Sequence, residues 1–401
     1  NYVRELESPD TSTKVLKDAA PHERESYTVM RVVRSWSENY ATLSELYRLI
    51  SDITQKQLSR KRADQRLATI LSRKKPYSRL ALVGAHFLTA SSLTVALGGS
   101  WGAGLSAGIF FAFIYLGNFW ISLLKMPGFF TMVSGSALIT LSGLYVANES
   151  SLLLNLAGVA GAPYIVAAGL IILLPTSRMV STIQDALTGF PLTAAGKFVS
   201  TGVLVLGIVV GFSSAIAVLK LLGLPTFNIQ DEVITPGDTW RHFVFMLIAS
   251  ASVGMIYFAR WRNLLWIVAV SATAIWVFNG VAALTGDAQE RTATFISAVV
   301  VGMLSTYLAH RLNAPASCFY VPSLTFLLPG LAIFRGMCLL VIQAQGGEGL
   351  ANTVTAVIVI LSMASGVVLG GALMQYLMQK FMRAETLEAW PMTHMMPTLH
   401  R

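Results

Sequence analysis

Long apolar stretches, separated by short polar connections, fill the chain from residue 79 onward. A helix needs about 20 apolar residues to cross the hydrocarbon core of a bilayer. Ten stretches come close to this length or exceed it, and each is predicted to be a membrane-spanning helix. The pattern therefore predicts an all-α, polytopic membrane protein with spans at residues 79–98, 101–124, 127–147, 153–174, 193–219, 241–259, 263–285, 292–309, 316–344 and 351–379.

The residues before the first span follow a different pattern. In "VVRSWSENYATLSELYRLISDI", apolar side chains recur at steps of three and four, which predicts an amphipathic helix inside a helical arm from about residue 27 to 72. This apolar face is compatible with packing inside a cytosolic domain, with pairing to a second copy in a homo-oligomer, or with lying on the bilayer. Its members are Val33, Trp36, Tyr40, Leu43, Tyr47 and Ile50.

Charge supports the division into an arm and a membrane domain. Only 12% of the residues are charged, which is about half the share in soluble globular chains. Residues 1–79 hold 10 of the 20 acids and 16 of the 29 bases, and later bases such as Lys125 and Arg311 gather in alternate connections. Because cytoplasmic loops are enriched in Lys and Arg, both termini are predicted to be cytoplasmic. The same rule explains the net charge of +9 without a nucleic-acid partner.

A repeat divides the ten spans into two units of five. When Pro175 is placed over Pro322, Gly189 falls on Gly336, and a further span follows each segment. Five spans are an odd number, so the two units must insert with opposite orientation, which predicts two inverted five-helix repeats. Each following span carries Gly-x-x-x-Gly, a pattern that lets helices approach closely: Gly207 and Gly211 in the first unit, Gly366 and Gly370 in the second.

The predicted organisation has five parts, the first of which we expect to be a piece of a longer protein because the chain starts at Asn1. They are a charged helical cytosolic arm at 1–78, the first repeat at 79–222, an extracytoplasmic linker at 223–239, the second repeat at 240–380 and a cytosolic tail at 381–401.

Proline in the two repeated segments predicts broken helices. A proline removes a backbone donor and clashes with the preceding turn, and such breaks are tolerated at membrane depth only inside protein or along a water-filled cavity. Freed carbonyls and helix amino ends can bind the ammonium and carboxylate groups of an amino acid. We therefore predict a substrate site between the two segments, formed by Pro175, Thr176, Ser177, Pro322, Ser323, Pro329, Gly330 and Arg335.

Two residues are candidates for carrying a proton. Asp185 is the one acid inside the repeated segments, and an intramembrane carboxylate is a functional hypothesis by default; the alternative is a residue that caps a helix at the cytoplasmic surface. His86 lies within the first span, where it is either a proton relay or a structural histidine. Lys197 opens the fifth span and is interpreted as a positive-inside anchor.

These segments resemble a known family. "LPTSRMVSTIQDALTGFPLTAAGKFVSTGVLVLGIVVG" and "VPSLTFLLPGLAIFRGMCLL" are similar to two blocks of the threonine/serine exporter family, and the resemblance extends from about residue 32 to 380. It implies ten spans in two fused halves, a cytosolic amino-terminal region, and proton-driven secondary export of threonine and serine across the plasma (inner) membrane of a prokaryote.

Other functions find less support in the sequence. "GGSWGAGLSAG" lacks the Gly-Lys-Ser/Thr ending of a phosphate-binding loop, and no metal-ligand spacing or nucleophile–base pair is evident. We therefore expect no cofactor, no metal and no enzymatic activity. Two alternatives stay open: a transporter of another small anion such as a dicarboxylate, and a membrane scaffold or enzyme that acts through its cytosolic arm.

Overall fold

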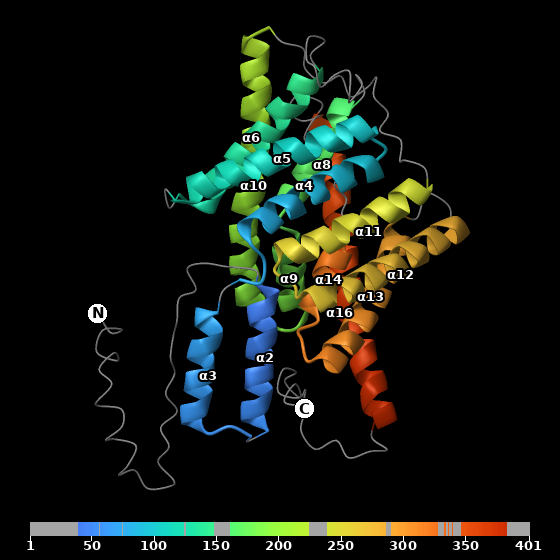
Figure 1. Cartoon of the computed structure of the whole chain (residues 1–401). Coiled ribbons are helices and arrows are strands. Elements are labelled where there is room, and N and C mark those ends of the chain that lie inside the picture. Colours follow the sequence, from blue (N-terminus) through green and yellow to red (C-terminus); the bar gives the residue numbers. More distant parts are fainter. Residues whose placement is uncertain are drawn as a thin grey trace. The chain divides into compact units, whose positions relative to one another are not determined.

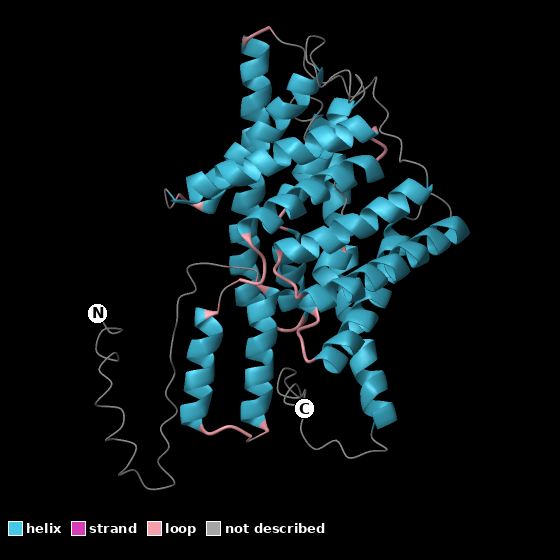
Figure 2. Ribbon diagram, in the orientation of Figure 1, coloured by secondary structure: helices cyan, strands magenta, loops and turns pink. Residues whose placement is uncertain are grey.

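The computed structural model describes residues 39–55, 57–73, 75–123, 126–147, 161–223, 239–285, 290–327, 333, 336, 339 and 346–382. Figures 1 and 2 show that these residues form helices joined by loops, with no strand among them. The chain is therefore an all-helical protein in the part that the structure describes.

The helices follow the predicted order of apolar stretches. The first half contains α4 (Arg79–Ala96), α5 (Trp101–Leu123), α6 (Gly128–Ala147), α8 (Gly161–Leu173), α9 (Thr176–Leu187) and α10 (Pro191–Leu221). The second half contains α11 (Thr239–Ile256), α12 (Trp261–Thr285), α13 (Glu290–Leu312), α14 (Ser317–Ser323), the 3₁₀ turn η3 (Thr325–Leu327) and α16 (Gly346–Met382).

Most of these helices have the length and composition of membrane spans. Among the described residues, seven helices are long and apolar enough to cross a membrane, and the bent pair of α8 and α9 makes up to eight. The prediction of a multi-pass membrane protein is therefore confirmed, whereas ten spans remain a prediction. The ninth predicted span, 316–344, begins as the short helix α14, and most of its later residues lie outside the described part.

The same helix pairing recurs in the two halves. In the first half α10 packs along α6, and a Cβ atom added at Gly207 would lie 2.9 Å from the carbonyl oxygen of Phe129. In the second half α16 packs along α13, and a Cβ atom added at Gly366 would lie 2.6 Å from the carbonyl oxygen of Phe295. Glycine is required at both positions because a side chain would meet backbone rather than a movable side chain.

The next glycine of each pair continues this correspondence. A Cβ atom at Gly211 would overlap the carbonyl oxygen of Val133, and one at Gly370 would overlap that of Val299. Val133 and Val299 each follow by four residues the phenylalanine contacted by the first glycine. Each glycine pair therefore packs its helix against two carbonyls spaced one turn apart.

Among the described helices, the most extensive contacts between the halves are those of α4 with α11 and of α9 with α16. The first core contains the buried side chains of Leu93, Val166 and Phe212, and the second contains those of Phe319 and Met363. Val180 of α9 belongs to the second core although α9 comes from the first half of the sequence. Helix α9 is thus the element that carries first-half residues into the second half.

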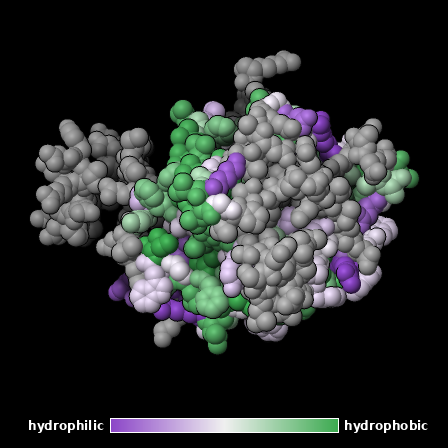
Figure 3. Space-filling view, turned by 90° about the horizontal axis from the view of Figure 1, so that it is seen from above, coloured by the Kyte–Doolittle hydropathy of each residue, from purple (hydrophilic) through white to green (hydrophobic). Residues whose placement is uncertain are grey.

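Large apolar side chains also lie on the surface. Figure 3 shows, in a view from above, a band of hydrophobic side chains across the described part of the surface, and Phe198 and Trp276 are 71% and 75% exposed. Extended apolar surfaces are uncommon on soluble monomers. The exposed apolar faces of these helices are suited to contact with lipid. Their other faces pack against each other in the two cores.

The structure divides the predicted arm into two helices. Within the range of about residue 27 to 72 that was expected to be helical, it describes α2 (Tyr40–Thr54) and α3 (Arg60–Ser72), and residues 27–38 lie outside the described part. Helix α2 ends at Thr54 and α3 begins at Arg60, and the chain reverses between them (Figure 1). An ion pair of 2.6 Å between Arg66 and Asp52 then joins α3 to α2.

Members of the predicted apolar face differ in exposure. Tyr40 is buried, whereas Leu43 and Ile50 are exposed. The buried side chains of α2 are Tyr40, Ser44 and Leu49. The hydroxyl of Ser44 donates to the carbonyl of Tyr40 in the same helix, at 2.7 Å.

Candidate functional site

The first broken segment lies between α8 and α9. Helix α8 ends at Leu173, Pro175 stands at the N-cap of α9 with φ −76° and ψ 60°, and the two helix axes differ by 45°. The carbonyl of Pro175 then accepts the first hydrogen bond of α9 from the amide of Met179, at 3.0 Å. Because Pro175 has no amide hydrogen, it cannot continue the ladder of α8. Ser177 follows in the first turn and is buried.

The end of α9 explains the local pattern "DALTGFP". Gly189 has φ +90°, in the left-handed region, and the amide of Phe190 donates to the carbonyl of Asp185 at 2.9 Å. This bond and the glycine form the common Schellman ending of a helix. Pro191 then occupies the first turn of α10, where a missing amide hydrogen has no cost to the helix. The two helices therefore form a tight hairpin.

The hairpin brings Asp185 and Lys197 together. Lys197 Nζ lies 2.6 Å from Asp185 Oδ2, and the two side chains are 23% and 22% exposed, in the order Asp185 and Lys197. Lys197 Nζ also lies 3.5 Å from the hydroxyl of Ser181. A carboxylate in the last turn of a helix faces the negative end of the helix dipole. Asp185 therefore does not cap the amino end of a helix, and the ammonium group of Lys197 offsets an otherwise unfavourable position.

The residue next to Asp185 links the two halves. The hydroxyl of Tyr320, on α14, donates a 3.0 Å hydrogen bond to Oε1 of Gln184, on α9. Tyr320 is buried. The ion pair and this hydrogen bond are therefore on adjacent residues of α9.

The second broken segment is short. Pro322 lies inside α14, which ends one residue later at Ser323, and the chain continues as the 3₁₀ turn η3. The hydroxyl of Ser323 donates to the carbonyl of Ile267 in α12 at 3.1 Å, and that of Thr325 donates to the carbonyl of Pro322 at 2.8 Å. Ser323 is fully buried. Its predicted role in substrate binding stays a prediction, and its hydroxyl fixes α14 to α12 in this structure.

His86 lies in a different environment from Asp185. Its ring stacks on that of Tyr115 with centroids 4.2 Å apart, and the ring of Phe111 lies 5.9 Å away. Both aromatic residues belong to α5, so His86 packs between α4 and α5. These contacts are apolar, whereas Asp185 lies among polar side chains.

Several predicted site residues cannot be placed. Pro329, Gly330 and Arg335 lie outside the described residues, as does the side chain of Thr176. Gln184 and Tyr320 were not predicted as site residues, and Lys197 was predicted to be a positive-inside anchor. The turn signal Gly189–Pro191 was the available clue that Lys197 folds back onto α9.

A small hollow lies elsewhere in the first half. It is lined by α4, α5, α6 and α8, with Ala90, Phe111, Ile139 and Gly169 among its walls. No wall comes from α9, α10 or α14, so the hollow is separate from Asp185. Within the described residues, no three His, Cys, Asp or Glu side chains are grouped so that they could hold a metal ion. The polar cluster at Asp185 is therefore the candidate site that we consider further.

Comparison with known proteins decides the family. Residues 6–219 match a family model described as a threonine/serine exporter, and residues 242–373 match a second model, "Threonine/Serine exporter, ThrE". The chain belongs to the threonine/serine exporter family. The two matched ranges of this exporter chain divide between residues 219 and 242, close to the boundary between the halves.

Two curated relatives agree with this membership of the exporter family. The "Probable threonine/serine exporter" of Mycobacterium tuberculosis (strain ATCC 25618 / H37Rv) is 29% identical over 90% of this chain and 67% of its own length. The "Threonine/serine exporter" of Corynebacterium glutamicum is 28% identical over 85% of this chain and 69% of its own length. No solved structure matches the chain. The relatives are named as transporters, so the exporter-family chain is not an enzyme.

Proposed function

We propose that the chain is a secondary exporter of threonine and serine that exchanges its substrate for protons at the plasma (inner) membrane of a prokaryote. Support for the substrate class comes from the names of the two relatives. The observation that carries the mechanism is the ion pair between Asp185 and Lys197, 2.6 Å apart, at the end of a helix that begins in a proline break. No cofactor takes part in this proposal.

The ion pair suits an amino-acid zwitterion. A carboxylate and an ammonium group already face each other here, and an amino acid carries the same two groups in complementary form. The substrate ammonium group would bind Asp185, and the substrate carboxylate would bind Lys197. When Asp185 takes up a proton it loses its charge, so it no longer attracts either ammonium group. Proton and substrate therefore compete for one carboxylate, which is the requirement for antiport.

Alternating access needs two halves that can move as units. The matching glycine contacts of α10 on α6 and of α16 on α13 support two halves with the same internal packing. With five spans each they would be inverted repeats, which is a common arrangement in secondary transporters. The contact of Gln184 with Tyr320 joins the halves beside Asp185. We infer that this contact changes when the site opens to the other side.

Transport in proteoliposomes tests the proposed function. Purified protein should release preloaded radiolabelled threonine faster when the receiving compartment is acidic, because inward proton flow drives export. Excess serine should compete with threonine, whereas a dicarboxylate such as succinate should not. If succinate competes with threonine and serine does not, the small-anion alternative is favoured. If neither threonine nor succinate is transported, the transporter proposal is wrong.

A further inference from the structure

Helix α2 contacts the membrane domain through its first turn. The amides of Tyr40 and Ala41 donate to the carbonyls of Tyr257 and Phe258, at 3.0 and 3.1 Å. The first amides of a helix have no partner inside the helix. Here they bind the connection between α11 and α12, and the ring of Tyr40 lies edge-on to that of Tyr257, with centroids 5.6 Å apart.

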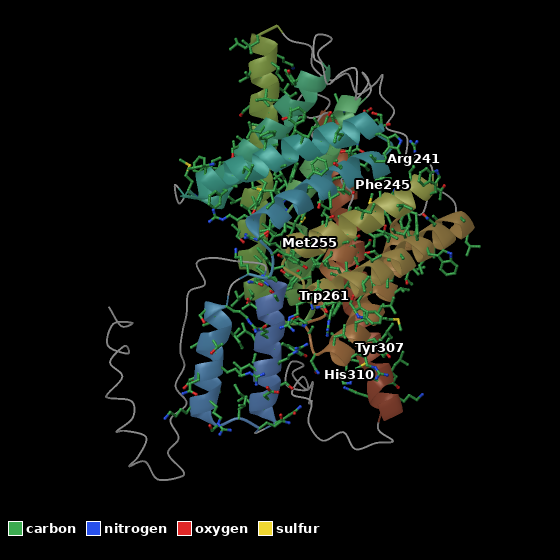
Figure 4. All side chains as sticks on the ribbon, viewed as in Figure 1. Arg241, Phe245, Met255, Trp261, Tyr307 and His310 are labelled. Atoms are coloured by element: carbon green, nitrogen blue, oxygen red, sulfur yellow. The ribbon has the colours of Figure 1, made fainter. Side chains whose placement is uncertain are left out.

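A second connection is held further along α2. Arg48 Nε donates to the carbonyl of Asn313 at 3.2 Å, and its terminal nitrogen donates to the carbonyl of Leu312 at 3.0 Å. Leu312 is the last residue of α13. The guanidinium group therefore lies at the negative end of the α13 dipole, where a cation is favourable. Figure 4 shows Tyr307 and His310 near this end of α13, and Trp261 at the start of α12.

Both connections contain a residue in an unusual backbone conformation. Phe258 has φ +57° and Asn313 has φ +47°, and they are the two non-glycine residues with positive φ in the described part of the chain. A bulky residue such as Phe is strained in this region, and such strain persists only where surrounding contacts hold it. In each case the carbonyl of the strained residue accepts a hydrogen bond from α2.

An ion pair adds to these contacts. Glu45 Oε1 lies 2.6 Å from a terminal nitrogen of Arg260, and it also pairs with Arg73 at the end of α3. Its side chain is only 14% exposed. The hydroxyl of Tyr77 donates to the carbonyl of Ala259 at 2.7 Å, and burial raises the pKa of Tyr77, so the phenol stays a neutral donor at physiological pH.

The connection that Arg48 binds, between α13 and α14, leads directly into α14. Asn313 is followed four residues later by Ser317, where α14 starts, and Ser44 of α2 lies 3.6 Å from the sulfur of Cys318. Two residues after Cys318 comes Tyr320, whose hydroxyl binds Gln184 beside Asp185. Arg48 is therefore connected to Gln184, beside Asp185, through its hydrogen bond to Asn313, the chain from Asn313 to Tyr320, and the hydrogen bond of Tyr320.

We propose that α2 is a positioning element of the transport site, in which Arg48 and Glu45 hold the two connections so that α14 presents Tyr320 to Gln184. This inference rests on the proposed function of α9 and α14 as the site. Arg48 and Glu45 do not contact the substrate; they act through α14. When the halves rearrange, α14 moves against these bonds, and the bonds set how often the site leaves the conformation described here.

Labelling of Cys318 tests the inference without measuring transport. In the full chain with Cys338→Ser, Cys318 is the remaining thiol, buried under α2. A membrane-permeant maleimide should label it at least about tenfold faster in Arg48→Ala, because the variant loses two charge-assisted hydrogen bonds to the connection that precedes α14. Arg48→Lys should restore slow labelling in part, because a lysine can still donate to the carbonyls. Asp52→Asn is the matched control, since Asp52 pairs only with Arg66 of α3 among the ion pairs of α2.

A charge exchange between Glu45 and Arg260 distinguishes the loss of their ion pair from a general folding defect. Glu45→Arg and Arg260→Glu should each speed labelling, and the double variant should return it toward the wild-type rate while restoring the maximal rate of threonine efflux. The inference is wrong if Arg48→Ala and Glu45→Arg label at the wild-type rate, or if Asp52→Asn labels as fast as they do. If wild-type protein shows no efflux while the labelling pattern holds, the proposed function fails and the positioning of α14 by α2 stands.

Discussion

Lys197 Nζ lies 2.6 Å from Asp185 Oδ2, although twelve residues and a helix reversal separate the two in sequence. The reversal at Gly189 folds the first turns of α10 back along the last turn of α9. Lys197 also approaches the hydroxyl of Ser181. The pairing gives Lys197 a defined partner inside the protein, and it gives Asp185 a counter-charge at a helix end where a carboxylate is otherwise disfavoured.

Replacing Lys197 should destabilise the protein. Lys197→Gln leaves the partly buried carboxylate of Asp185 without its cation, which should lower the free energy of unfolding by about 1–3 kcal/mol. The midpoint of thermal unfolding in detergent measures this loss. Lys220→Gln is the control, because Lys220 lies at the exposed end of the same helix.

The double variant separates stability from coupling. Asp185→Asn with Lys197→Gln removes both charges and should recover most of the lost stability, because two neutral side chains can hydrogen-bond to each other. It should not recover proton-driven efflux. Equal stability of the single and double variants would show that the two side chains do not interact in solution.

The hydrogen bond between Tyr320 and Gln184 should affect transport more than folding. Tyr320→Phe removes the donor and keeps the ring, at a cost of about 1 kcal/mol to the conformation described here. The maximal rate of threonine efflux should fall about fivefold, which corresponds to that free energy. Tyr376→Phe on the exposed face of α16 serves as control. An unchanged rate in Tyr320→Phe would mean that this bond is not part of the transport cycle.

The glycine contacts should respond in the same way in both halves. Gly211→Ala and Gly370→Ala each place a methyl group against a backbone carbonyl, of Val133 and Val299 respectively. Overpacking of this kind costs about 1–3 kcal/mol or more. Thermal unfolding should show a similar loss for both variants. Gly202→Ala, on the same helix as Gly211 with no atom within 4 Å of the added Cβ, should be neutral or stabilising.

Several features of the fold were predictable because they depend on local sequence. Apolar length alone placed most helices near their observed positions, since a span needs a continuous apolar run. The break at Pro175 followed from proline chemistry. The helical period of residues 33–50 indicated a helix there, but it did not show that Ser44 is buried while Leu43 and Ile50 are exposed.

Contacts between distant segments were not predictable in this way. Gln184 and Tyr320 are 136 residues apart, and nothing in either local pattern names the other. Arg48 and Asn313 are separated by 265 residues, so the docking of α2 likewise needed the structure. The ion pair of Lys197 was not predicted because a basic residue at the start of a span usually marks the cytoplasmic interface, and only the observed helix reversal brings Lys197 to Asp185.

The membrane topology gives a further prediction from charge. A cysteine at position 231, in an acidic connection, should react with an impermeant maleimide added outside the cell, whereas a cysteine at position 383, near the basic tail, should react only after permeabilisation. Both variants, Asp231→Cys and Arg383→Cys, need the Cys318→Ser and Cys338→Ser background. The opposite labelling pattern would overturn the assignment of both termini to the cytoplasm.

Threonine efflux by Asp185→Asn in proteoliposomes tests whether Asp185 couples transport to protons. The amide keeps the size of the side chain and its ability to hydrogen-bond, but it cannot release a proton. Our account predicts that proton-driven threonine efflux is lost, while threonine counterflow, which needs no net proton movement, continues at a measurable rate. Normal proton-driven efflux by Asp185→Asn would contradict the account and leave His86 as the remaining candidate for the coupling residue.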